Sequence, residues 1–228
     1  FQLFKNNKPI LLFLLKQQII IPDEKIAHFL TIDKYYRRNY PIYFFNEFQD
    51  FFPPKIQTKI KNKLNTYIEN DPELFEQNRM NGENESYVCS LIRNDNIDDF
   101  IIYLNKNNMS LNNSIVQSIF ESNSLLLKKE CTLIEYAAFF GSIQIFNFLK
   151  INNVPMDSNL WFYAIHGKNA EIIHLLEDDH IATPNASYRP LLIESMKCHH
   201  SDIVSYFKDN FMKYSIDQDN KYLYKVIQ

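Results

Sequence analysis

The chain has 228 residues, of which 46% are hydrophobic and 22% charged, and its formal net charge is −3 at pH 7. This composition excludes wholesale disorder, and the length allows one or two domains with a sizeable core. The slightly acidic balance gives no basic field for nucleic acid, so we expect no nucleic-acid partner. The three glycines, Gly82, Gly141 and Gly167, stand far apart. Since a phosphate-cradling loop needs several glycines within a few residues, P-loop and dinucleotide chemistry is excluded.

The cysteines and the apolar runs indicate the cellular compartment of the chain and its relation to membranes. Cys89, Cys131 and Cys198 are widely spaced and odd in number, which favours a reduced, intracellular and cytoplasmic setting. The most apolar stretch, residues 10–21, is interrupted by Lys16 and is shorter than the about 20 residues that span a bilayer. We therefore expect a buried helix there and no membrane insertion. Because the sequence begins with Phe1, we interpret it as a fragment, from which a targeting signal is not assessable.

Residues 1–80 are expected to form packed helices without a repeat. Pro54 stands where a first helical turn accepts proline, and Ile56, Ile60 and Leu64 follow at helical spacing. Four lysines occupy the other faces of this helix, and we interpret them as a solvated surface rather than a nucleic-acid patch: Lys55, Lys59, Lys61 and Lys63.

Aromatic doublets and a polar stretch complete this N-terminal region. The doublets are interpreted as core rather than as a stacking platform, because no basic groove accompanies them: Tyr35-Tyr36, Phe44-Phe45 and Phe51-Phe52. Residues 78–85 are rich in Asn and Glu and form the best candidate linker.

Beyond residue 85 the sequence repeats itself, and this repetition predicts the fold. Residues 132–149 align without a gap with residues 159–176, so that Tyr136 matches Tyr163 at an offset of 27. A third copy, residues 190–207, follows at an offset of 31, and a weaker copy lies at residues 86–103. Each copy contains two short apolar helices separated by a polar break. Because no such pair buries its apolar face alone, neighbouring pairs must stack.

The polar breaks carry helix-end signals. Gly141 is suited to end a helix in the left-handed conformation, and Ser142, Asn169 and Asn96 are suited to cap the helix that follows. In the second copy the glycine, Gly167, comes one position early. Small residues on the first helix of each pair would let its neighbour approach closely: Ala137, Ala138, Ala164 and Ser195.

These residues resemble the ankyrin repeat. Residues 132–138, Thr-Leu-Ile-Glu-Tyr-Ala-Ala, are similar to its T-P-L-H-x-A-A opening, and residues 139–149 are similar to the segment that follows. The phrases at residues 133–146 and 163–167 resemble more closely a family of uncharacterised proteins from protists. In that family a helical N-terminal region and a domain of unknown function precede further ankyrin repeats.

The resemblance implies an all-α, ankyrin-like helical-hairpin solenoid with an N-terminal helical capping region. Residues 1–80 would be the cap, and residues 81–228 would hold the repeats and continue into more. The expected repeats are residues 86–112, 130–155, 157–182 and 188–212. Because the offsets fall short of the usual about 33 residues, the turn fingers should be clipped. Residues 112–129 should form a long loop or a short additional helix.

Two clusters suggest catalytic or metal chemistry, and both also have a structural interpretation. Cys198-His199-His200 offers thiolate and imidazole, which suit zinc. However, adjacent residues rarely face one metal ion, and no C-x-x-C or H-x3-H partner accompanies them. His166 with Lys168 and Glu171 resembles acid–base machinery, but these residues also fit helix ends. We therefore expect no enzyme, metal, cofactor or small-molecule substrate, and keep a metal-dependent or acid–base enzyme as the alternative.

The function that the sequence favours is a non-catalytic scaffold that binds a protein partner through the concave face of the repeats. In ankyrin proteins the variable contact positions are those of the turn and of the two residues before the glycine. Adjacent aromatic residues on one helix cannot both face one core, which draws attention to Phe139 and Phe140. The candidate contact residues are Arg93, Lys128, Lys129, Phe139, Phe140, Met156, His166, Arg189 and Lys197, with Asn94, Cys131, Ser158 and Cys198 beside them.

Overall fold

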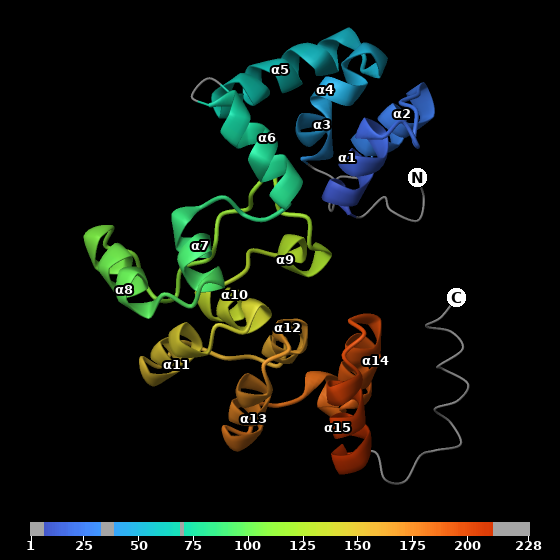
Figure 1. Cartoon of the computed structure of the whole chain (residues 1–228). Helices are drawn as coiled ribbons and strands as arrows, with labels where there is room; N and C mark the ends of the chain where they lie inside the picture. Colours follow the sequence, from blue (N-terminus) through green and yellow to red (C-terminus); the bar gives the residue numbers. More distant parts are fainter. Residues whose placement is uncertain (1–6, 33–38, 69–70, 212–228) are drawn as a thin grey trace. The chain divides into compact units, whose positions relative to one another are not determined.

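The chain is almost entirely helical. The computed structural model describes residues 7–32, 39–68 and 71–211 (Figure 1). This described part is 67% helical and holds no strand, only one isolated antiparallel bridge between Ser114 and Thr132. The predicted all-α class is therefore confirmed. Among the described helices, none combines the length and the apolar character that crossing a bilayer requires.

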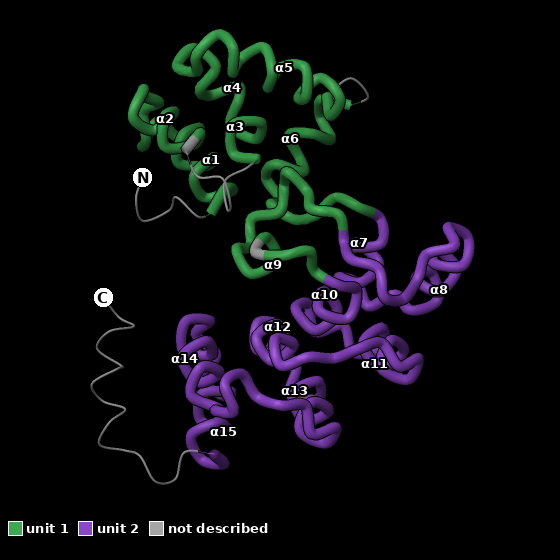
Figure 2. Tube along the Cα trace, turned by 180° about the vertical axis from the view of Figure 1, so that it is seen from behind, with its two compact units in different colours: residues 1–86, 116–131 green, residues 87–115, 132–228 purple. Residues whose placement is uncertain are grey.

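The chain divides into two compact units (Figure 2). Unit 1 comprises residues 1–86 and 116–131, and unit 2 comprises residues 87–115 and 132–228. The division thus falls at residue 86 rather than at the expected residue 80. Residues 116–131, which include most of the insertion expected at residues 112–129, belong to the N-terminal unit and contain the short helix α9 (Ser124–Lys128).

Unit 1 is a cluster of helices around an aromatic core. Its helices are α1 (Lys8–Lys16), α2 (Glu24–Ile32), α3 (Tyr40–Tyr43), α4 (Phe45–Phe48), the 3-10 turn η1 (Gln49–Phe51), α5 (Pro54–Ile68), α6 (Pro72–Asn81) and α9. Helix α5 begins at Pro54 and buries Ile60 and Leu64, as predicted, and its four lysines are exposed. Phe44, Phe45 and Phe52 are buried in the core, whereas Phe51 is 38% exposed. Tyr35 and Tyr36 lie outside the described residues.

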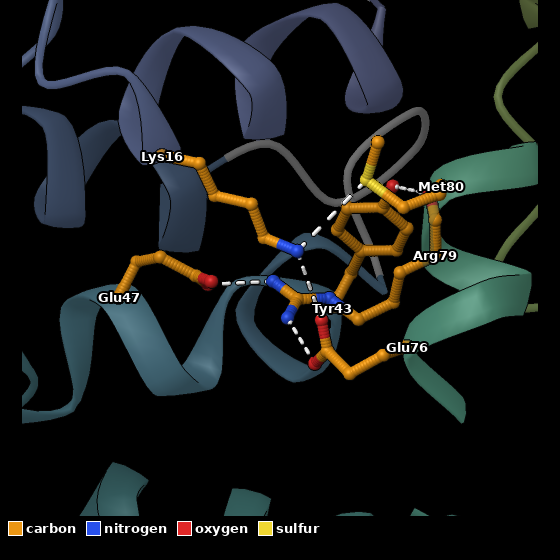
Figure 3. Close-up of polar contacts among 6 residues, drawn as sticks. All are labelled: Lys16, Tyr43, Glu47, Glu76, Arg79 and Met80. Carbon is orange, nitrogen blue, oxygen red and sulfur yellow. Dashed lines mark hydrogen bonds and ion pairs between the residues drawn. The ribbon is translucent and has the colours of Figure 1, made fainter. Parts of the chain in front are cut away.

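The expected linker at residues 78–85 begins within a helix: residues 78–81 are the last turn of α6, and residues 82–85 are non-helical. Arg79 lies in this last turn and is 1% exposed; its guanidinium pairs at 2.6 Å with one carboxylate oxygen each of Glu47 and Glu76 (Figure 3). The Tyr43 hydroxyl donates to the Arg79 carbonyl, and the guanidinium lies over the Tyr43 ring. These partners compensate the lost hydration of the buried guanidinium.

A buried lysine attaches residues 116–121 to the N-terminal helices. Lys8, at the start of α1, is 1% exposed and donates to the carbonyls of Ile119 at 2.8 Å and Glu121 at 2.6 Å. Its amine also lies over the rings of Tyr40 and Tyr43. Burial lowers the pKa of Lys8 to about 7, against the opposing attraction of the nearby carboxylates. These two hydrogen bonds explain why a segment distant in sequence belongs to unit 1.

The part of unit 2 that the structure describes, up to residue 211, contains four helix pairs. The pairs are α7 (Tyr87–Arg93) with α8 (Ile97–Lys106), α10 (Leu133–Phe140) with α11 (Ile143–Ile151), α12 (Leu160–Gly167) with α13 (Ala170–Asp178), and α14 (Arg189–Lys197) with α15 (Ser201–Phe211). Each pair lies within one of the four ranges that the sequence suggests. The first helices contact one another in the order α7, α10, α12, α14, and α8, α11 and α13 contact one another likewise (Figure 1).

The same junction recurs inside every pair. One residue adopts the left-handed conformation two positions before the second helix begins: Asp95, Gly141, Lys168 and His199. Asn96 and Asn169 cap the following helices through their side chains, as predicted. Ser142 does not, because its hydroxyl donates to the Ile92 carbonyl of the preceding pair at 2.5 Å.

Side chains of neighbouring junctions link one pair to the next. The Asp95 carboxylate accepts from the backbone N–H groups of Gln144 and Ile145 at 3.0 Å, so it caps the second helix of the next pair. The Asn169 amide donates to the Gly141 carbonyl at 2.9 Å. These bonds satisfy helix-end groups that would otherwise lack partners, and they hold adjacent pairs in register.

Gly167 explains why the glycine of the second copy comes one position early. It is the last residue of α12, and the left-handed residue of this junction is Lys168. A Cβ atom at position 167 would lie 2.1 Å from the Ala138 carbonyl oxygen and 2.8 Å from the Gly141 nitrogen. The glycine is therefore needed for the approach of two backbones and not for the turn.

Single substitutions of the adjacent residues Gly167 and Lys168 test whether the glycine is needed for the close approach of the two backbones or for the turn. Gly→Ala in a helix ordinarily stabilises by about 1 kcal/mol, but Gly167→Ala should destabilise by about 1–3 kcal/mol because the added Cβ overpacks the interface. Lys168→Gly relieves a left-handed conformation and should be neutral or stabilising by about 1 kcal/mol. Urea unfolding measures both; stabilisation by Gly167→Ala would refute the close approach.

The stability of unit 1 should depend on the protonation of Lys8. Between pH 7 and pH 10 the unfolded chain holds a proton that the folded Lys8 has lost, so stability should rise with pH, by roughly 1 kcal/mol per unit. Below pH 7 both states are protonated, and Lys8 adds no further pH dependence. Urea unfolding of wild type and Lys8→Met at pH 6, 8 and 9 measures the difference. Parallel pH profiles of the two proteins would contradict it.

Candidate functional site

The C-terminal ends of the four first helices lie next to one another in unit 2. Arg93 ends α7, Phe139 and Phe140 end α10, His166 is the penultimate residue of α12, and Lys197 ends α14. Because these helices contact one another in succession, their ends form a continuous row. We call this surface the strip and define it by Arg93, Tyr136, Phe139, Phe140, His166, Glu194, Lys197 and Cys198.

One end of the strip is held by an arginine over an aromatic ring. The Arg93 guanidinium lies 5.9 Å from the centre of the Phe140 ring and donates to the Tyr136 hydroxyl at 2.8 Å. The Tyr136 and Phe140 rings are 4.7 Å apart. Phe140 therefore covers a buried tyrosine while remaining partly exposed, and the arginine is fixed in place beside it.

The middle of the strip is a stack of Phe139 on His166. The two rings lie 5.1 Å apart with an interplanar angle of 21°, and Phe139 also makes an edge contact with Phe140 at 4.9 Å. Both phenylalanines are half-buried. We expected at least one of them to be exposed or to cover a neighbour. Both are partly exposed, and each covers a neighbouring ring: Phe139 covers His166, and Phe140 covers Tyr136.

The other end of the strip gathers three side chains with metal-binding atoms. His166 Nε2 lies 3.0 Å from Glu194 Oε1 and 3.5 Å from Cys198 Sγ, and the second oxygen of Glu194 pairs with Lys197 at 3.1 Å. The hydrogen bond with His166, assisted by Lys197, lowers the pKa of Glu194 to about 2. Burial, with the Glu194 charge beside it, raises the pKa of Cys198 to about 11. At neutral pH this end therefore presents a carboxylate and a protonated thiol.

The acid–base arrangement suggested by the sequence does not form around His166. Its ring faces Glu194 of the next pair, while Lys168 is the exposed left-handed residue of the junction and Glu171 lies in the first turn of α13. His166, Lys168 and Glu171 thus stand at helix ends, as the structural interpretation predicted.

Two further predicted contact residues of unit 2 lie away from the strip. Met156 precedes α12 and Arg189 begins α14, so both are half-buried at the opposite ends of the first helices. Arg189 is about 12 Å along the helix axis from Lys197, at 1.5 Å per residue. Lys129 is exposed and belongs to unit 1, and the side chain of Lys128 lies outside the described residues. The strip is accordingly defined without these four residues.

Glu194 is the functional candidate that the sequence reasoning missed. At the repeat offsets it occupies the position of Tyr136 and Tyr163, both of which are 1% exposed. A carboxylate at a position that is core in two other copies requires a polar partner. His166 supplies that partner. The glutamate in place of the tyrosine of the other two copies was the feature of the sequence that could have indicated this site.

Comparisons of the chain with protein-family models, with curated proteins and with solved structures found no match.

The raised pKa of Cys198 predicts that its thiol reacts slowly with alkylating reagents. At pH 8 its alkylation should be on the order of 100-fold slower than that of a free cysteine, because the thiolate is the reactive form. Glu194→Gln removes the neighbouring negative charge and should accelerate the reaction, whereas Lys197→Gln should slow it. Peptide mapping separates Cys198 from the buried Cys89 and Cys131. A fast reaction that is unaffected by Glu194→Gln would contradict these electrostatics.

Proposed function

We propose that unit 2 is an ankyrin-like helical-hairpin solenoid that binds a protein partner through the strip. The observation that carries the proposal is the continuity of the strip, in which four successive first helices contribute side chains that contact one another. Stacked repeats build extended binding surfaces in this way, from equivalent positions of successive units. The odd number and wide spacing of the three cysteines favour a reducing compartment for the scaffold.

Variation on the strip beside uniformity in the core supports a binding role. Equivalent core positions carry Ile145, Ile172 and Ile203, which are 0%, 0% and 6% exposed. The equivalent strip positions carry three different chemistries instead: Phe139, His166 and Lys197. Packing explains the constant isoleucines, whereas recognition of a partner gives a reason for the changing strip.

The chemistry of the strip fits a partner of mixed character. Phe139 and Phe140 offer a half-buried apolar centre, where an apolar side chain of the partner would gain most from losing water. Arg93 and Lys197 lie on either side and would pair with acidic groups at the rim. A slow thiol at Cys198 and a histidine held by Glu194 provide no activated nucleophile, which favours binding over catalysis.

Affinity capture from the source cell with the wild-type chain and a Phe139→Ala/Lys197→Glu variant tests the proposal. The substitutions remove the apolar centre and reverse one rim charge, so the partner should be lost. Phe139 is half-buried on His166, and the folded variant should lose only about 1–2 kcal/mol of stability. Quantitative mass spectrometry of the captured proteins, with circular dichroism of each variant, gives the comparison.

The matched control is Ile102→Ala/Ile151→Ala, which removes exposed apolar side chains from the second helices α8 and α11. A partner captured by the wild type and by this control, but not by the strip variant, supports the proposal. A captured set that is unchanged by the strip substitutions, or lost with the control, would refute it.

A further inference from the structure

His166, Glu194 and Cys198 form a three-residue cluster of metal-ligating atoms. Within the described residues it is the one group whose histidine, carboxylate and thiol atoms all lie within 4.8 Å of one another. Glu194 lies on α14, and Cys198, four residues further on, is the C-cap of that helix and keeps a right-handed helical backbone conformation, so the two share one face. His166 approaches this face from α12. The three atoms therefore come from two packed helices.

The distances suit a tetrahedral metal ion. With metal–nitrogen bonds of about 2.0–2.1 Å and metal–sulfur bonds of about 2.3 Å, tetrahedral angles place the nitrogen and sulfur about 3.5 Å apart. His166 Nε2 and Cys198 Sγ are 3.5 Å apart, and His166 Nε2 and Glu194 Oε1 are 3.0 Å apart. The nitrogen–oxygen distance is shorter than the about 3.4 Å of a tetrahedral site. The Glu194 oxygen and Cys198 Sγ lie within 4.8 Å of each other, so the Glu194 side chain must shift to complete the geometry.

We propose that His166 Nε2, Glu194 Oε1 and Cys198 Sγ bind a zinc ion, with the fourth coordination position open. A thiolate and an imidazole favour zinc over magnesium or calcium, which prefer all-oxygen sites. The sequence pointed away from a metal because Cys198, His199 and His200 are adjacent. The ligands of the proposed site instead come from neighbouring helix pairs. This proposal does not depend on the strip binding a protein.

Binding requires one proton to leave. The thiol of Cys198 releases its proton to solvent as the sulfur–zinc bond forms. The hydrogen that His166 Nε2 donates to Glu194 must move to Nδ1 by exchange with solvent, so that the ring binds zinc through the freed Nε2 lone pair. Glu194 can retain Lys197 on its other oxygen. The groups that face the thiol are His166, Glu194 and Lys197, and the ion's positive charge favours the thiolate over the thiol. Affinity should therefore rise as the pH rises toward 9.

Titration with Co²⁺, a spectroscopic substitute for zinc, tests the site. The wild-type chain should bind one ion with a thiolate-to-cobalt charge-transfer band, and Zn²⁺ should displace it. Cys198→Ser should abolish the band, and Glu194→Gln and His166→Gln should each weaken binding at least about 10-fold. The matched control is His174→Gln, which alters a second histidine–glutamate pair, 3.2 Å apart on α13; it should leave the titration unchanged.

A second measurement uses the wild-type chain alone. Zn²⁺ should protect Cys198 from alkylation at pH 8.5 in proportion to its occupancy, and a chelator should restore the reaction. A charge-transfer band that survives Cys198→Ser, a wild-type chain without such a band, or alkylation unaffected by Zn²⁺ would each overturn the proposal.

Discussion

Unit 2 depends on one constraint: α10 and α12 pack so closely that their backbones are in contact. The Ala138 carbonyl oxygen lies only 2.1 Å from the position that a Cβ of residue 167 would occupy. Ala137, Ala138 and Ala164 are fully buried at this interface. Bulkier residues would separate the helices. The separation would break the bond from Asn169 to Gly141 and the stack of Phe139 on His166. Small residues thus position the strip, although they do not belong to it.

Unit 1 uses a different device, because its segments are not related by repetition. Two buried basic side chains hold it together: Lys8 binds the carbonyls of residues 119 and 121, and Arg79 pairs with Glu47 and Glu76. Each of them also lies over the Tyr43 ring. Buried polar groups of this kind tolerate few alternative partners, since an unpaired one is costly. They specify which segments meet, whereas the aromatic core supplies most of the apolar burial.

The repeats were predictable from the sequence to the extent that they depend on local signals. The left-handed Gly141 and the caps at Asn96 and Asn169 follow from residue type and spacing. The functions of Gly167 and Ser142 could not be predicted, because both depend on a neighbouring pair. For the same reason the sequence suggested an insertion at residues 112–129, most of which belongs to unit 1. The cluster at Glu194 combines residues 28 and 32 positions apart, and the sequence showed only an anomalous carboxylate.

The central claim is that side chains of successive helix pairs meet in one continuous strip. A double-mutant cycle on Phe139 and His166, which belong to different pairs, tests it most directly. Urea unfolding of the wild type, Phe139→Ala, His166→Ala and the double variant gives the coupling free energy. The stacked rings predict a coupling of about 0.5–1.5 kcal/mol. Effects that add within about 0.3 kcal/mol would show that the two side chains do not touch.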